Sequence, residues 1–405
     1  MSTASGRAAG GRFGGVAARL EEIQAALREQ GLDGWLLYDL HARNAVAARL
    51  LGLGDLTRRY FVLLPAEGEP HAVTHRIEQG PWVEWPWVRH EYSAWRELDA
   101  VLAELLAGKR VAMEISPRDA VPAVDVVPAG VLELVRSAGA EVVSSGDLIT
   151  RFYSRWTAEG LASHRRAAGV LAAVAAEAFQ RAAAALRSGE TMYEGELRRW
   201  VLDELAARGC GVGADAIVAV GANAADPHYE TGERGAPLVR DQVLLLDLWA
   251  KEREDLVYAD QTWMAYLGES VPGRIIALWE VVRDARDAGV SFLRERWAAG
   301  QPVQGREVDD VVRGVITARG YGEAFVHRTG HSIDSATHGM GPNIDNLETS
   351  ETRLLIPGVG FSIEPGIYLR GDVGLRSEIN VYMGEAGPEV TPTSPQVELP
   401  ALLAS

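Results

Sequence analysis

Residues 243–266 read VLLLDLWAKEREDLVYADQTWMAY, and this stretch decides how the second half of the chain folds. Two apolar runs of strand length flank the charged segment 251–255, so we expect strands over residues 243–250 and 256–266 joined as a hairpin. Asp247 and Asp260 stand inside these runs, where a buried carboxylate is costly unless it is paired. Two carboxylates on neighbouring strands also repel each other, so a cation between them is the economical explanation.

Three motifs further along the chain carry residues of the same kinds. HRTGHSID contains His327 and His331, and His338 follows it. Glu364 in SIEPGIY and Glu378 in GLRSEINVY stand among apolar neighbours, which indicates that both lie inside strands. Carboxylates with imidazole suit a pair of divalent ions such as Mn, Co or Zn, and not a structural zinc site built from thiolates. Two such ions can share a bridging water and present it as hydroxide, while a nearby carboxylate carries a proton to the leaving amine.

The segments around these motifs follow the order helix pair, strands, helix pair, strands. This order predicts an α+β domain over residues 155–405. A smaller α/β domain is expected over residues 16–154, after a flexible tail of residues 1–15. The expected helices cover residues 16–30, 95–106, 159–186, 274–298 and 306–319, with one more opening at a capping box over 191–194. Further strands are expected over residues 34–38, 59–64, 71–75, 111–115, 216–220, 360–363 and 376–382.

Composition excludes several classes of function. The 405 residues include 40 Lys and Arg against 56 Asp and Glu, and the net charge of −16 disfavours partners with phosphate backbones or anionic lipid. A single cysteine, Cys210, permits no internal disulfide, and with no secretory signal in view we expect a cytoplasmic protein. The first twenty residues leave a transit peptide as a minor alternative. The most apolar run, residues 170–186, contains Glu177 and Arg181 and is expected to be a buried helix, not a membrane span.

The order Asp, Asp, His, Glu, Glu, together with TGHS, EPGIY and GLRSE, resembles the dinuclear metallopeptidases of the pita-bread fold over residues 155–390. That family includes methionine aminopeptidase, aminopeptidase P and prolidase. The preceding α/β domain resembles the creatinase-type N-terminal domain of aminopeptidase P and prolidase, which simple methionine aminopeptidases lack. The resemblance implies an Xaa-Pro dipeptidase (prolidase) acting on small peptides, with aminopeptidase P as the alternative. It also implies a homodimer.

The resemblance assigns a role to each site residue. Asp247, Asp260, His331, Glu364 and Glu378 match the metal ligands, and Glu364 also matches the general acid and base. His228, in DPHYE, matches a histidine near the substrate, His338 one that steadies the scissile carbonyl, and His327 a further histidine of the pocket. Arg376 matches an arginine that supports the last ligand, in or near the substrate site.

The residue that would hold the substrate carboxylate departs from the family pattern. Ser350 stands where larger prolidases have an arginine, and the longer turn between Asp247 and Asp260 is similar to that of a compact bacterial Xaa-Pro dipeptidase subfamily. A different positively charged side chain must then hold the substrate carboxylate. Arg370, close after EPGIY, is one hypothesis, and a residue within positions 39–43 of a second copy is another.

Two other classes of function stay open at this point. Creatinase-like hydrolases and the peptidase-like domains of histone chaperones keep the fold without the metal ligands, but this chain retains all five. A metal-dependent hydrolase of a non-peptide amide would show the same residues, and only substrate assays separate it from a peptidase.

Overall fold

The computed structural model describes residues 12–404, and the chain divides into two compact units between Tyr153 and Ser154. Of the tail expected over residues 1–15, residues 1–11 lie outside the described residues. Helix α1 (Gly14–Glu29) includes the last two residues of the predicted tail, residues 14 and 15.

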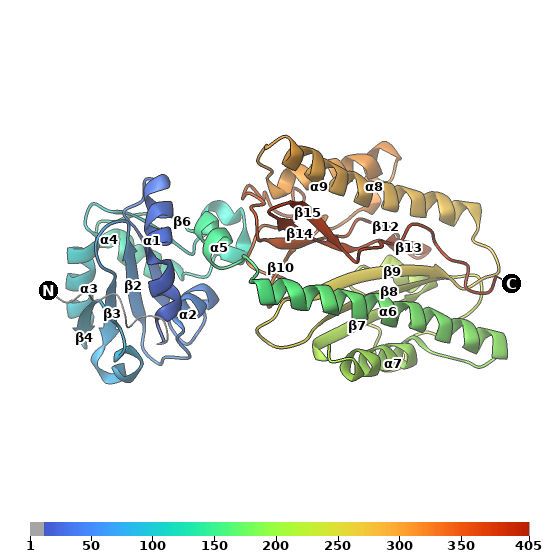
Figure 1. Ribbon diagram of the computed structural model, residues 1–405, viewed down its shortest axis with the longest axis horizontal. Helices are drawn as coiled ribbons and strands as arrows, with labels where there is room; N and C mark the ends of the chain where they lie inside the picture. Colours follow the sequence, from blue (N-terminus) through green and yellow to red (C-terminus); the bar gives the residue numbers. More distant parts are fainter. Residues whose placement is uncertain (1–11, 405) are drawn as a thin grey trace. The chain divides into compact units, whose positions relative to one another are not determined.

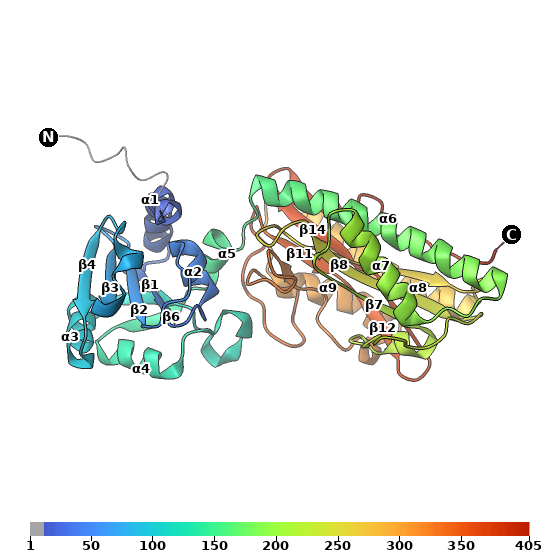
Figure 2. The ribbon, with the colours of Figure 1, turned by 90° about the horizontal axis from the view of Figure 1, so that it is seen from below.

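The first unit is a mixed six-stranded sheet in the order β4-β3-β2-β1-β5-β6 with helices on both faces (Figures 1 and 2). Strand β1 pairs antiparallel with β2 and parallel with β5. Leu98 and Leu102 of α3 and Val135 of α4 pack on one face of the sheet, while α1 contacts β2. The elements of this unit are α1, β1 (Gly34–Asp39), α2 (Ala45–Leu51), β2 (Tyr60–Pro65), β3 (His71–His75), β4 (Val88–Tyr92), α3 (Trp95–Leu106), β5 (Arg110–Met113), α4 (Ala129–Ser137), β6 (Glu141–Ser144) and α5 (Gly146–Phe152).

The second unit stacks two sheets between two pairs of helices (Figure 1). Helices α6 (Ala158–Ser188) and α7 (Glu194–Ala207) cover the antiparallel sheet β7-β8-β9, which Figure 2 shows from the helix side. Helices α8 (Gly273–Ala298) and α9 (Gly305–Ala318) cover the other sheet, β10-β11-β14-β15, and the ribbon β12-β13. The strands are β7 (Val212–Val220), β8 (Val243–Lys251), β9 (Ala259–Tyr266), β10 (Ser332–Ile333), β11 (Gly360–Ile363), β12 (Gly366–Leu369), β13 (Val373–Arg376), β14 (Ile379–Gly384) and β15 (Gly387–Thr391).

Helix α6 is long and apolar enough to cross a membrane by length and composition alone. Its buried face accounts for that character without a membrane. Ala168, Leu171 and Ala175 lie in one core cluster with Leu246 and Leu248 of β8. A core helix that is buried along one side has the same composition as a short span.

The α+β architecture expected from the sequence is confirmed, but several local predictions are wrong. The capping box predicted over residues 191–194 lies two residues later, where Glu196 accepts the backbone N–H of Tyr193. Glu194 is instead fully buried, and its carboxylate accepts from Val220 N at 2.7 Å and from the Tyr229 hydroxyl at 2.8 Å. The strand predicted over residues 376–382 is broken at residues 377 and 378, because the chain turns there from β13 into β14. Strand β9 begins at Ala259 and not at residue 256.

Candidate metal centre

One wall of the site is the predicted hairpin of β8 and β9. Asp247 pairs with Thr262 and Trp249 pairs with Asp260, so the two aspartates are diagonal neighbours on one face of the sheet. The side-chain amide of Asn380 holds the backbone of Asp260 on both sides, accepting from its N–H at 3.0 Å and donating to its carbonyl at 2.7 Å. Both carboxylates are buried.

The opposite wall comes from the ends of short strands in the second sheet. His331 lies directly before β10, Glu364 directly after β11, and Glu378 directly before β14. The two glutamates therefore stand at junctions between strands, and not inside strands as the sequence pattern predicts. Leaving the ladder at a junction frees a side chain from the alternation of the strand, so both carboxylates turn into the space between the sheets.

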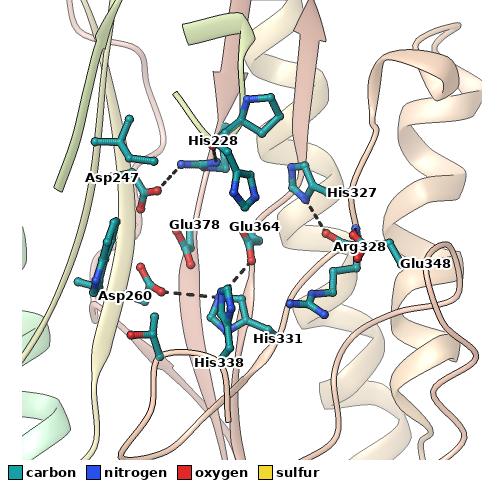
Figure 3. Close-up of a pocket in the computed structure, with 15 residues that line it drawn as sticks. His228, Asp247, Asp260, His327, Arg328, His331, His338, Glu348, Glu364 and Glu378 are labelled. Carbon is teal, nitrogen blue, oxygen red and sulfur yellow. Dashed lines mark hydrogen bonds and ion pairs between the residues drawn. The ribbon is translucent and has the colours of Figure 1, made fainter. Parts of the chain in front are cut away.

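These five side chains converge on one cavity of about 400 Å³ (Figure 3). His331 Nε2 lies 3.6 Å from Asp260 Oδ2 and 3.4 Å from Glu364 Oε1. Ligand atoms of Asp260, His331 and Glu378 all lie within 4.8 Å of one another. Asp247 enters from the same wall as Asp260. The structure therefore brings together all five residues that the sequence singles out as ligands.

The protonation of His331 shows what this cluster requires. Its Nδ1 faces the Ser332 carbonyl at 3.3 Å and so carries the proton. Burial lowers the pKa of the ring to about 4, so the ring is neutral at pH 7. Nε2 then directs a lone pair at carboxylate oxygens, an arrangement that is repulsive unless a cation lies between them.

Two buried carboxylate oxygens lead to the same conclusion. Within residues 12–404, Asp247 Oδ1 and Glu378 Oε1 have no hydrogen-bond partner. Buried polar oxygens are nearly always paired, and an unpaired one is costly. Burial, followed by repulsion from neighbouring carboxylates, raises the pKa of Asp260 and of Glu378. A donor set of carboxylate oxygens with one imidazole fits hard or borderline divalent ions.

Arg376 and Thr262 hold the ligands in place. The Arg376 guanidinium donates to Asp247 Oδ2, to Thr262 Oγ1 at 2.8 Å and to the Pro227 carbonyl at 3.2 Å. The Thr262 hydroxyl in turn donates to Glu378 Oε2 at 2.9 Å. Arg376 lines the pocket as predicted, but its donors are directed at the protein, which makes it a support for the ligands and a poor group for holding substrate.

The three predicted histidines line the same cavity but differ in what their rings can do. The rings of His228 and His338 are exposed and make no hydrogen bond with residues 12–404. His327 has both ring nitrogens engaged, with Nδ1 2.7 Å from the Arg328 carbonyl and Nε2 2.8 Å from the Tyr368 hydroxyl. His228 and His338 are therefore free to meet a ligand, and His327 is not.

Arg370 lies apart from the cluster. It lines a neighbouring cavity, which shares Pro227 with the pocket described above. Six residues that the sequence analysis did not single out also line the pocket, and three of them carry large or charged side chains, namely Trp249, Arg328 and Glu348. The alternation of β8 could have indicated Trp249, which stands two residues after Asp247. Arg328 and Glu348 lie on loops, where no periodic signal exists.

Comparison with known proteins agrees with this geometry. Residues 164–385 match the model of metallopeptidase family M24. An Xaa-Pro dipeptidase of Lactobacillus delbrueckii subsp. lactis is 34% identical over 209 residues, which are 50% of this chain and 50% of that protein. The chain thus spans about half the length of the first curated relatives it matches.

Two mycobacterial proteins match over nearly the whole chain. A probable dipeptidase PepE of Mycobacterium tuberculosis is 26% identical over 385 residues, covering 92% of each protein. The crystal structure of dipeptidase PepE from Mycobacterium ulcerans superposes with a TM-score of 0.73 at 25% identity, over 96% of this chain and all of the other. The first unit is thus part of the likeness, and not only the unit that holds the five candidate ligands.

Proposed function

Because the chain belongs to metallopeptidase family M24, we propose that this metal-dependent peptidase is an Xaa-Pro dipeptidase, which hydrolyses the peptide bond before a C-terminal proline. The observation that carries the proposal is the convergence of the five ligands on a cavity of about 400 Å³, near the lower end of the volumes typical of small-ligand sites. Relatives named as dipeptidases support the same substrate class.

Asp247, Asp260, His331, Glu364 and Glu378 would hold two divalent ions in this proposal. When bound, the ions supply the positive charge that activates a water and polarises the scissile carbonyl. We propose Mn as the ion, with Co and Zn as alternatives, because the donor set is rich in carboxylate oxygens.

Other roles in the reaction, proton transfer and binding of the substrate carbonyl, are proposed for side chains of the pocket. Glu364 is proposed as the general base and acid. It takes a proton from the attacking water and delivers it to the departing proline nitrogen. The Ser362 hydroxyl donates to Glu364 Oε1 at 3.1 Å and so orients that carboxylate. His338 and His228, with free ring nitrogens, are placed to donate to the carbonyl oxygen of the substrate.

Aminopeptidase P is the second candidate, and one observation favours it. Pro227 lines both the metal-ligand pocket and the neighbouring cavity that contains Arg370. A peptide that continues beyond proline would need space of this kind, whereas a dipeptide would not.

Hydrolysis of Ala-Pro and of Ala-Pro-Ala by chelator-stripped enzyme, with and without added Mn, Co or Zn, tests both candidates. We expect the metal to restore cleavage of Ala-Pro and little cleavage of the tripeptide. Preferred cleavage of Ala-Pro-Ala would move the assignment to aminopeptidase P. Cleavage of neither peptide with any of the ions would reject both.

We further propose a cytoplasmic homodimer. The proposed location in the cytoplasm is supported by the single cysteine, which is buried and can form no internal disulfide. The oligomeric state is measured by light scattering of the purified protein, for which we expect twice the chain mass of 43.7 kDa.

A further inference from the structure

Arg328 is a positively charged side chain of the pocket whose guanidinium is not paired with another described residue. Two arginines line the cavity, Arg328 and Arg376, and the second is engaged by Asp247 and Thr262. Within residues 12–404, the guanidinium of Arg328 makes no hydrogen bond and no ion pair, and the side chain is only partly buried. Figure 3 shows it extending from its loop toward the centre of the pocket, on the side opposite Asp247.

The backbone that carries Arg328 is held at both of its polar groups. Its N–H donates to Glu348 Oε1 at 2.9 Å, and its carbonyl accepts from His327 Nδ1 at 2.7 Å. Glu348 lies on the outer side of the loop, away from the centre of the pocket (Figure 3). Because the backbone is already fixed, binding a ligand orders only the side chain of Arg328 and not the loop that carries it.

Helix α9 fixes the residues on either side of Arg328. Arg313 donates to the carbonyls of Phe325 at 2.9 Å and of His327 at 2.8 Å. The buried carboxylate of Asp309 accepts from the Thr329 hydroxyl and, at 3.1 Å, from the Thr329 N–H. These contacts lock a loop whose one free charged group is directed at the site.

The engaged ring of His327 fits this arrangement. A carbonyl only accepts, so Nδ1 carries the proton and Nε2 accepts from the Tyr368 hydroxyl. Burial lowers the pKa of the ring to about 3, so it stays neutral and both bonds persist at working pH. His327 is therefore a positioning residue for Arg328.

We infer that Arg328 binds the C-terminal carboxylate of the substrate, and so makes the enzyme selective for dipeptides. This inference rests on the proposed function. The guanidinium presents paired N–H donors whose geometry matches a carboxylate, and it enters a cavity of about 400 Å³ from the side facing the metal ligands. A dipeptide with its scissile bond at the ligands has its carboxylate only one residue further on. Arg370, the candidate suggested by the sequence, lines the neighbouring cavity instead.

The test compares Ala-Pro with Ala-Pro amide, which lacks the carboxylate, in wild type, Arg328→Met, Arg328→Lys and the control Arg370→Met. For wild type we expect a clear preference for Ala-Pro. Arg328→Met should raise the KM for Ala-Pro by about 10- to 100-fold with kcat within about threefold, because a charge-assisted hydrogen bond is lost. The amide should be cleaved almost as before. Arg328→Lys keeps the charge without the paired donors and should fall between the two.

The outcomes separate the inference from the proposed function. If wild type cleaves Ala-Pro but Arg328→Met impairs both substrates equally, or if Arg370→Met raises the KM for Ala-Pro instead, Arg328 does not bind the carboxylate and the dipeptidase assignment stands. If wild type cleaves no Xaa-Pro dipeptide with any of the three ions, the assignment itself fails. Should Arg328→Met not fold, as judged by circular dichroism, the ratio of Ala-Pro to amide cleavage in Arg328→Lys decides the question.

Discussion

Four candidate ligand carboxylates line one cavity, and three of them, Asp247, Asp260 and Glu378, are buried, so contacts within the protein are needed to orient them. Thr262 is the residue through which the two walls of the site are joined, because its hydroxyl accepts from Arg376 Nε and donates to Glu378 Oε2. Arg376 also donates to Asp247. One uncharged hydroxyl thus links a ligand from the hairpin, through an arginine, to a ligand from the second sheet.

Replacing Thr262 with Val keeps the shape of the side chain and removes this link. We expect the affinity for Mn²⁺ to fall by about 10- to 100-fold, as is usual when a partner that orients a ligand is lost. Isothermal titration calorimetry of chelator-stripped protein measures the affinity for Mn²⁺. Thr262→Ser retains the hydroxyl and should bind within about threefold of wild type. Equal affinities in wild type and Thr262→Val would show that this hydroxyl does not orient Glu378.

Residue type and order are enough to predict which side chains meet at the site, but not what each one contacts. Asp247 and Asp260 are recognisable because a carboxylate inside an apolar run demands a partner. Arg376 is recognisable too, yet only the structure shows that its donors are engaged by the protein. Arg328 and its free guanidinium could not be predicted, since the direction of a loop side chain depends on contacts from Asp309 and Arg313, which are distant in sequence.

At the level of elements, His164 ties helix α6 to both sheets of the second unit. Its Nδ1 lies 2.7 Å from the Tyr258 carbonyl, just before β9, and its Nε2 lies 2.7 Å from the Thr391 hydroxyl at the end of β15. The carbonyl requires a proton on Nδ1, and the hydroxyl donates to Nε2. The ring is buried, and burial favours its neutral form.

This contact makes stability depend on pH. Burial lowers the pKa of folded His164 to about 4, whereas an unfolded histidine titrates near 6.5. Between these values the unfolded chain binds a proton that the folded protein excludes, so stability is full above about pH 6.5 and is lost as the pH falls toward 4. We expect the unfolding free energy of the metal-free protein to drop by about 2 kcal/mol more between pH 7 and pH 5 in wild type than in His164→Gln. Urea denaturation at each pH measures the unfolding free energy. Parallel pH profiles of that free energy in the two proteins would contradict the prediction.

Long elements could be predicted from the sequence more consistently than short ones. Helices α8 and α9 are predicted accurately, because a period of 3.6 residues repeats many times in each. Both begin only one residue before their predicted starts. Strands β10 and β12 have two and four residues and are not predicted, whereas β11, also of four residues, is predicted at its observed bounds. Missing these junctions is also why Glu364 and Glu378 are wrongly expected inside strands.

At the scale of the whole molecule, each of the two units has its own core. Leu36, Phe61 and Leu102 belong to the core of the first unit, while Val282, Phe361 and Val381 belong to a core of the second. All five ligands lie in the second unit. Domains with separate cores are expected to unfold as separate cooperative units.

Metal binding should therefore stabilise one unit and not the other. An ion that binds only the folded state stabilises it by about 2.7 kcal/mol at a concentration of 100 times its Kd, which corresponds to a rise in Tm of roughly 5–10 °C for a domain of this size. In differential scanning calorimetry we expect two transitions, of which Mn²⁺ raises only one. His331→Ala removes the one imidazole ligand and should abolish that rise without moving the second transition. If Mn²⁺ instead raises both transitions by the same amount, the two units unfold as a single cooperative block, and the separate cores do not set the cooperativity of the chain.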